Sequence, residues 1–153
     1  MDSSTVITSL KSIDILVVDD DAGDVLLTKK ALNNSKMISN INSVGNGVEA
    51  LAYLRQEREY EDAIRPDLIL LDLNMPLKDG REVLTELKQD DNLRLIPVVI
   101  LTTSDSNLDI LKSYDLQASC FVTKPVDLEQ FTRVVQSIQD FWFTIVKLPQ
   151  NED

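Results

Sequence analysis

The sequence predicts an α/β fold, a doubly wound five-stranded parallel sheet with helices on both faces. Short apolar runs alternate five times with longer amphipathic stretches along the 153 residues. Alternation of this kind builds right-handed strand–helix–strand units into an open parallel sheet. One run, residues 68–71, is aliphatic at every position, as expected for a strand that is covered on both faces. No internal repeat or linker interrupts the pattern, so we expect one domain.

The expected strands are apolar runs bounded by charged or turn residues. The first reads Ile-Asp-Ile-Leu-Val-Val, the second is weaker, and the third is the aliphatic run. The fourth contains Pro97 near its start, where the missing N–H donor is tolerated. The five strands are residues 13–18, 40–44, 68–71, 96–101 and 119–122.

The expected helices are stretches in which apolar residues recur at spacings of three and four. They cover residues 22–33 and 48–57, a segment around Val83, Leu84 and Leu87, residues 108–114, and a long final segment marked by Leu128, Phe131, Val135, Ile138 and Trp142. We expect residues 1–12 to form a flexible N-terminal segment, 13–143 the domain, and 144–153 a C-terminal tail.

The composition excludes several classes of function. A net charge of −11 disfavours binding to nucleic acid, which requires clustered lysine and arginine, and docking to anionic membranes. The absence of histidine excludes Ser-His-Asp catalysis and histidine-containing zinc sites. A single cysteine, no secretory signal and no apolar run of ~20 residues favour a cytoplasmic protein.

Polar side chains follow four of the five expected strands. They are Asp19, Asp20 and Asp21, then Asp72, then Thr102, then Lys124 followed by Pro125. Ligands of open parallel sheets bind at the carboxyl ends of the strands, so these groups are expected at one edge. Taken singly, an aspartate or threonine could cap a helix and the lysine could be solvated. A cap accounts for one acid and leaves the convergence of the others unexplained.

Converging carboxylates at this edge require a countercharge. Two carboxylates ~4 Å apart repel by about 4 kcal/mol at an effective dielectric near 20. Ligation by a few carboxylates and water favours Mg²⁺ over zinc. A metal-bound carboxylate beside a lysine and a hydroxyl is suited to phosphoryl transfer onto an aspartate. The pattern therefore predicts that Asp72 is phosphorylated.

Four motifs in this order resemble the receiver domain of two-component response regulators. They are "ILVVDDD", "LILLDLNMPLKDG", "ILTTS" and "VTKPVD". The resemblance covers about residues 13–143 and implies the flavodoxin-like receiver fold, with strand order 2-1-3-4-5.

The resemblance also implies a role for each matching residue, with Asp72 as the phosphoacceptor. The Mg²⁺ ligands it implies are Asp20, Asp72 and the backbone carbonyl of Asn74, with Asp19 acting through water. Thr102 would supply the switch hydroxyl, and Lys124 would pair with the phosphoryl group. The Lys124–Pro125 peptide bond would be cis, and Phe121 would be the aromatic residue that turns inward upon activation.

A narrower resemblance, in "YLRQEREYED", "DGREVL" and "FWFTIVKLP", is to single-domain regulators paired with bacterial and cyanobacterial phytochromes. It implies a sensor histidine kinase as phosphoryl donor, with a phytochrome as one candidate. About ten residues follow 143, so we expect no DNA-binding output domain. The protein would signal through a phosphorylation-dependent protein–protein contact and would not turn over a separate substrate, beyond assisting its own phosphotransfer and slow autodephosphorylation.

Two other functions use similar residues. Phosphatases of the haloacid dehalogenase superfamily carry their nucleophile in a D-x-D motif after the first strand, and the triple aspartate contains such a motif. In those phosphatases two further acids follow the lysine at the end of a later strand, whereas here Asp127 and Glu129 follow Lys124 at the start of a helix. A pseudo-receiver would be an interaction module that never takes phosphate, yet all acceptor-site residues are present. A nucleotide-binding Rossmann domain lacks support because no G-x-G-x-x-G follows the first strand.

The final helix carries more apolar residues than one buried face requires. We expect a homodimer face that combines these extra residues with the preceding helix. Its residues are Leu108, Leu111, Tyr114, Val134, Phe141 and Ile145. Alternatively, the tail folds back and covers the second apolar stripe.

Overall fold

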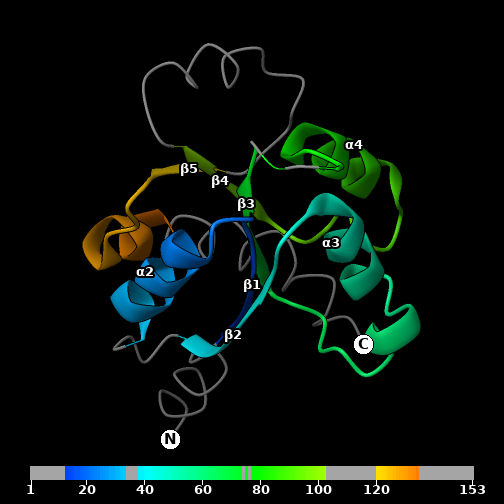
Figure 1. Ribbon diagram of the computed structural model, residues 1–153, viewed down its shortest axis with the longest axis horizontal. Helices are drawn as coiled ribbons and strands as arrows, with labels where there is room; N and C mark the ends of the chain where they lie inside the picture. Colours follow the sequence, from blue (N-terminus) through cyan, green and yellow to red (C-terminus); the bar gives the residue numbers. More distant parts are fainter. Residues whose placement is uncertain (1–12, 34–37, 74, 76, 103–119, 135–153) are drawn as a thin grey trace, which may run out of the picture.

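The computed structural model describes residues 13–33, 38–73, 75, 77–102 and 120–134, and Figure 1 labels their elements. The expected helix over 108–114 and the two terminal segments lie outside these residues. No helix in the described part of the chain is long and apolar enough to cross a membrane.

Five parallel strands form one sheet in the order β2-β1-β3-β4-β5. The predicted fold class and strand order are therefore confirmed. The strands are β1 Ile13–Val18, β2 Ile38–Val44, β3 Leu68–Asp72, β4 Val98–Thr102 and β5 Cys120–Thr123.

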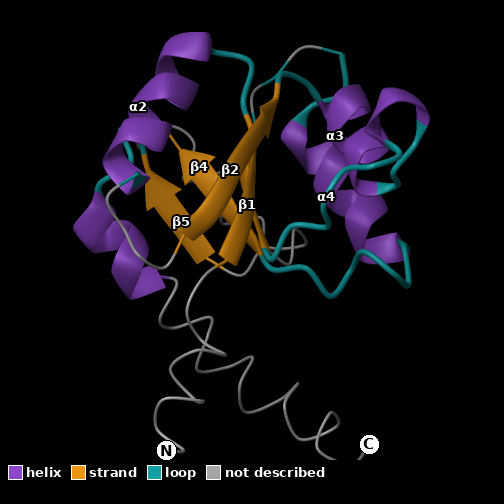
Figure 2. Ribbon diagram, turned by 90° about the horizontal axis from the view of Figure 1, so that it is seen from below, coloured by secondary structure: helices purple, strands orange, loops and turns teal. Residues whose placement is uncertain are grey.

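Helices cover both faces of this sheet (Figure 2). The labelled helical elements are α2 Ala22–Leu32, α3 Gly47–Leu54, the 3₁₀ helix η1 Arg58–Tyr60 and α4 Gly80–Gln89. A further helix begins at Leu128. In Figure 2, α2 and this last helix lie on one side of the sheet, and α3 and α4 lie on the other.

Two apolar clusters separate the sheet from its helices. One contains Ile69 and Leu71 with side chains from α3 and α4, and the other contains Leu68 and Leu70 with Leu32 of α2. Successive strand residues point to opposite faces, so alternate members of β3 enter different clusters. The continuous aliphatic run of β3 is thereby explained.

Each labelled α-helix begins with a side-chain cap. Asp21 accepts a hydrogen bond from the backbone N–H of Asp24 at 3.0 Å and begins α2. Asn46 begins α3 in the same way, and Asp79 forms a reciprocal capping box with Glu82 at α4. Of the three consecutive aspartates, Asp21 is therefore the helix cap, and capping does not account for Asp19 and Asp20.

Most elements differ from the predicted boundaries by one or two residues, and β2 begins at Ile38 instead of residue 40. Two of the differences have a local cause. β4 begins at Val98, because Pro97 before it has no N–H and contributes only its carbonyl, which accepts from Ile69 at 3.0 Å. The helix expected over 48–57 ends at Leu54. The chain then reverses through Gln56, whose φ is +57°, and enters η1.

Candidate functional site

The carboxyl edge of the sheet brings together acids from two adjacent strands. Asp19 and Asp20 follow β1, and Asp72 ends the neighbouring β3. The Asp19 N–H donates to the Val44 carbonyl at 3.1 Å, and Asp19 Oδ1 accepts from the Asp21 N–H at 3.0 Å. Asp19 is thus held in place from both its backbone and its side chain.

Burial distinguishes the acids of this edge. Asp19 and Asp72 are 2% and 6% exposed, whereas Asp20 is exposed. One carboxylate oxygen from each of the three lies within 4.8 Å of the others. Three oxygen donors at this spacing, two of them buried, match the ligand preference of a hard divalent cation and not that of zinc.

Lys124, just after β5, is the cation that faces these acids. Its Nζ lies 2.7 Å from Asp19 Oδ2, 3.0 Å from Asp24 Oδ2 and 3.1 Å from Asp72 Oδ2. The contacts with Asp24 and Asp72 are hydrogen bonds. The contact with Asp19 is the shortest but is an ion pair without hydrogen-bond geometry, because no donor is aligned with the buried Asp19 Oδ2.

The charge of Lys124 is fixed by these neighbours. Burial alone would lower the pKa of its ammonium group, but the close contact with Asp19 and the hydrogen bonds that Lys124 donates to Asp24 and Asp72 outweigh burial and raise the pKa above its ordinary value. The side chain is 8% exposed. Lys124 is therefore a permanently charged donor directed at the end of β3.

The structure places the other predicted site residues as follows. Thr102 ends β4, but its side chain and all of Asn74 lie outside the described part. The Lys124–Pro125 peptide bond is cis. Phe121 is 43% exposed, so its ring lies at the surface.

Sequence reasoning missed Asp24 as a partner of Lys124. It is the third residue of α2 and carries no motif of its own. The available signal was its spacing, because a residue three positions after the Asp21 cap lies in the first helical turn, above the carboxyl ends of the strands.

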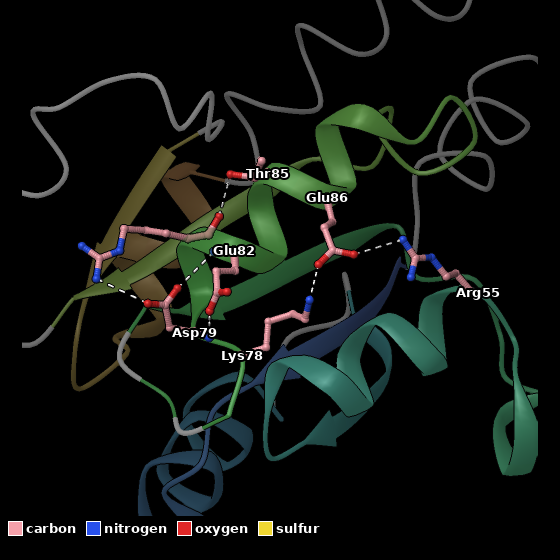
Figure 3. Close-up of polar contacts among 7 residues, drawn as sticks. Arg55, Lys78, Asp79, Glu82, Thr85 and Glu86 are labelled. Atoms are coloured by element: carbon pink, nitrogen blue, oxygen red, sulfur yellow. Dashed lines mark hydrogen bonds and ion pairs between the residues drawn. The ribbon is translucent and has the colours of Figure 1, made fainter.

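The loop between β3 and α4 is held by backbone packing and by ion pairs. A Cβ on Gly80 would come within 2.4 Å of the Asp72 carbonyl oxygen, and one on Gly47 within 2.2 Å of the Lys78 carbonyl oxygen. The Lys78 ammonium pairs with Glu86 of α4, whose other oxygen faces Arg55 at 3.4 Å (Figure 3). The segment after Asp72 is thereby tied to both α3 and α4.

Comparison with known proteins shows the family of this fold and site. Residues 15–136 match the model of the response regulator receiver domain. The chain belongs to this family. The receiver is 45% identical to the response regulator Rcp1 of Synechocystis over 88% of this chain and 92% of that protein.

Solved structures of related receivers agree in fold. The phosphorylated cyanobacterial phytochrome response regulator RcpA is 50% identical, with a TM-score of 0.70 over 86% of this chain and 94% of that one. The bacteriophytochrome response regulator AtBRR is 39% identical, with a TM-score of 0.76 over 82% and 91%. The Mn²⁺-bound form of Rcp1 is 44% identical, with a TM-score of 0.68 over 88% and 96%. The receiver is thus a response regulator whose signalling depends on phosphorylation.

Proposed function

We propose that Asp72 accepts a phosphoryl group from the phosphohistidine of a sensor histidine kinase. The observation that carries this proposal is the convergence of Lys124 and two further acids on the end of β3, with Lys124 Nζ 3.1 Å from Asp72 Oδ2. Because the chain has no histidine, the donor is another protein or a small phosphoryl donor.

A bound Mg²⁺ would neutralise charge on the transferring phosphoryl oxygens. By family resemblance it would be held by Asp20, Asp72 and the Asn74 carbonyl, with Asp19 acting through water; the three-acid cluster and the Mn²⁺-bound relative support a divalent ion here. An Asp72 carboxylate oxygen forms the new bond to phosphorus. The phosphorus–nitrogen bond breaks, and its electron pair returns to the donor imidazole. Lys124 N–H groups donate to the phosphoryl oxygens, and the Thr102 hydroxyl is the proposed switch donor.

Incorporation of phosphate tests this assignment. With Mg²⁺ and acetyl phosphate, the intact protein should gain the mass of one acid-labile phosphoryl group. Asp72→Asn should abolish the gain, because an amide cannot form the acyl phosphate. Asp91→Asn, which removes a carboxylate that is 98% exposed, should retain it. Full labelling of the Asp72→Asn protein would assign the nucleophile to another residue.

The kinase partner is proposed to be a bacterial phytochrome. Support comes from RcpA and AtBRR, which are described as phytochrome and bacteriophytochrome response regulators. Phosphotransfer from each histidine kinase of the host, measured at short times, should be fastest from a phytochrome kinase. Faster transfer from a kinase without a phytochrome module would contradict the assignment.

We also propose that the protein acts in the cytoplasm as a phosphoacceptor without separate substrate turnover. The alternative, a phosphatase of the haloacid dehalogenase type, predicts steady release of phosphate from small phosphomonoesters. A receiver should release none above the level of its Asp72→Asn variant.

A homodimer is the proposed signalling assembly. In the structure, Val134 is partly buried against the core; the other residues of the expected face, Leu108, Leu111, Tyr114, Phe141 and Ile145, lie outside the described part. Sedimentation at micromolar concentration, with and without beryllofluoride, should detect a dimer whose affinity changes with the phosphoryl mimic. A monomer under both conditions, or a dimer unaffected by Phe141→Asp, would contradict it.

A further inference from the structure

Asp24 is a partner of Lys124 that the proposed phosphotransfer does not use. The acids that could hold the metal are Asp19, Asp20 and Asp72, and among the described residues Asp24 is outside that group. Its carboxylate nevertheless accepts a hydrogen bond from Lys124 Nζ at 3.0 Å. The site therefore contains a carboxylate directed at the lysine and not at the metal ligands.

The position of Asp24 is set by α2. Its backbone N–H donates to the Asp21 cap at 3.0 Å, so it lies in the first helical turn, where the helix dipole favours a negative charge. Its side chain is 36% exposed, whereas those of Asp19 and Asp72 are 0% and 9% exposed. Asp24 is thus the partner of Lys124 that water can most easily solvate.

An ammonium group has three N–H donors. Three carboxylate oxygens already lie within 3.1 Å of Lys124 Nζ. A phosphoryl group on Asp72 replaces one negative charge by nearly two and presents three acceptor oxygens. The N–H that now donates to Asp72 passes to the phosphoryl group, but a second hydrogen bond to that group requires Lys124 to move away from Asp19 or Asp24. Asp24 is the more exposed of these two acids and is therefore the one to leave.

We propose that Asp24 is a positioning residue that competes with the phosphoryl group on Asp72 for Lys124, so that it stabilises the unphosphorylated state relative to the phosphorylated one. The proposal rests on the phosphorylation of Asp72. It assigns to Asp24 control over how much of the protein is held in the phosphorylated form. A substitution that removes the negative charge of Asp24 would also remove its repulsion of the phosphoryl oxygens on Asp72.

Beryllofluoride binding at saturating Mg²⁺, measured by isothermal titration calorimetry, tests the competition at equilibrium. We expect Asp24→Asn to bind beryllofluoride roughly three- to tenfold more tightly than wild type, because its side chain no longer competes as a carboxylate for Lys124. A tenfold change in affinity corresponds to about 1.4 kcal/mol. Saturating metal keeps changes in metal affinity out of the comparison. A residue with only a structural role would weaken binding when altered, so the direction of the change separates the two roles.

Two controls complete the test. Asp24→Glu keeps the charge and should bind within about twofold of wild type, and Asp91→Asn removes one charge far from Lys124 and should leave the affinity unchanged. Unchanged or weaker binding by Asp24→Asn, with normal wild-type binding, would overturn the role of Asp24 alone. Absence of binding by the wild type, or binding that survives Asp72→Asn, would instead overturn the assignment of Asp72 and the competition with it.

Discussion

Gly80 and Gly47 lie where backbone atoms of the loop after β3 occupy the space of a side chain. A Cβ on Gly80 would be 2.4 Å from the Asp72 carbonyl oxygen and 2.6 Å from Leu73 Cα. A Cβ on Gly47 would be 2.2 Å from the Lys78 carbonyl oxygen and 2.7 Å from Val83 Cγ2. Main-chain atoms cannot move aside as a flexible side chain can, so both positions require glycine.

Alanine at either glycine should therefore destabilise the protein. We expect Gly80→Ala and Gly47→Ala to lower the free energy of unfolding by roughly 1–3 kcal/mol, the usual cost of overpacking. Gly45→Ala is the matched control, because a Cβ there meets nothing within 4 Å, and its effect should be within about 0.5 kcal/mol. Urea denaturation of the three variants measures the difference, and equal stability of all three would contradict the packing.

The hydrogen bond of Tyr60, in the segment after α3, makes a pH-dependent contribution to stability. Its hydroxyl donates to Glu49 Oε1 at 2.7 Å, and this hydrogen bond, with smaller effects of burial and of the Glu49 and Glu59 charges, raises the pKa of Tyr60 to about 12. The folded pKa lies above the ordinary value of 10.0, so the stabilisation is complete below pH 10 and is lost as pH rises toward 12.

Tyr60→Phe should be less stable than wild type by about 1 kcal/mol at pH 8, the usual net value of a hydrogen bond. The difference should shrink between pH 10 and 12, as the wild-type tyrosine ionises. Burial also raises the pKa of Tyr53, so absorbance at 295 nm should show late tyrosine titration in the wild type, and Glu49→Gln should move the Tyr60 part of it to lower pH. A stability difference that stays constant to pH 12 would show that the hydroxyl proton is not involved.

At the scale of elements, Glu86 connects three parts of the chain. Its carboxylate pairs with Lys78 in the loop after β3 and with Arg55 at the end of α3, while Glu86 itself belongs to α4 (Figure 3). The Lys78 hydrogen bond is the main cause that lowers the pKa of Glu86 below 4.5, against a smaller opposing effect of burial.

Glu86→Gln should lower the free energy of unfolding at pH 7 by about 0.5–1 kcal/mol, because partly exposed ion pairs are screened by solvent. The folded pKa of Glu86 is lowered, so its contribution is present above pH 4.5 and is lost as pH falls through the folded pKa. Chemical denaturation at pH 7 and at about pH 3 should show a smaller difference at the lower pH. Asp91→Asn, whose ion-pair partner Arg94 is 3.9 Å away, should show none at either pH.

The sequence was most informative about elements whose pattern is local. The aliphatic run of β3 predicted a strand near its observed bounds. The spacing of Val83, Leu84 and Leu87 predicted a helix, and all three are buried residues of α4. The end of the helix at Leu54 was not predicted, because it involves a positive φ at Gln56, a residue without the conformational freedom of glycine, and backbone hydrogen bonds from Gln56 to Tyr53 and from Glu57 to Ala52. The three-way contact of Glu86 was equally hidden, since nothing in its spacing identifies Arg55 as a partner.

At the scale of the whole molecule, the phosphorylation site could be predicted because the topology of the sheet places its residues together. A parallel sheet brings the carboxyl ends of β1, β3 and β5 to the same side, so the acids and Lys124 were expected together from the parallel arrangement of the strands. The hydrogen bond between Lys124 and Asp24 was not expected, because it depends on where the first turn of α2 lies above that edge.

The excess of acids at this edge predicts that divalent metal stabilises the fold. Mg²⁺ at ten times its Kd should raise the free energy of unfolding by about 1.4 kcal/mol, as for any ligand that binds only the folded state. Thermal melts in MgCl₂ and in NaCl of equal ionic strength separate binding from screening. Asp20→Ala should lose the specific increase, and an equal response to both salts would contradict a metal site.

The ion pair between Asp24 and Lys124 joins residues 100 positions apart, and this separation has a consequence for synthesis. A chain emerging from the ribosome exposes the acids of β1 and β3 well before the lysine that neutralises them. In the described part of the chain, β5 pairs only with β4 and is the last strand of the sheet, so the lysine follows the final strand along the sequence. The proposed phosphorylation site can therefore be complete only after Lys124 has been translated, 100 positions after Asp24.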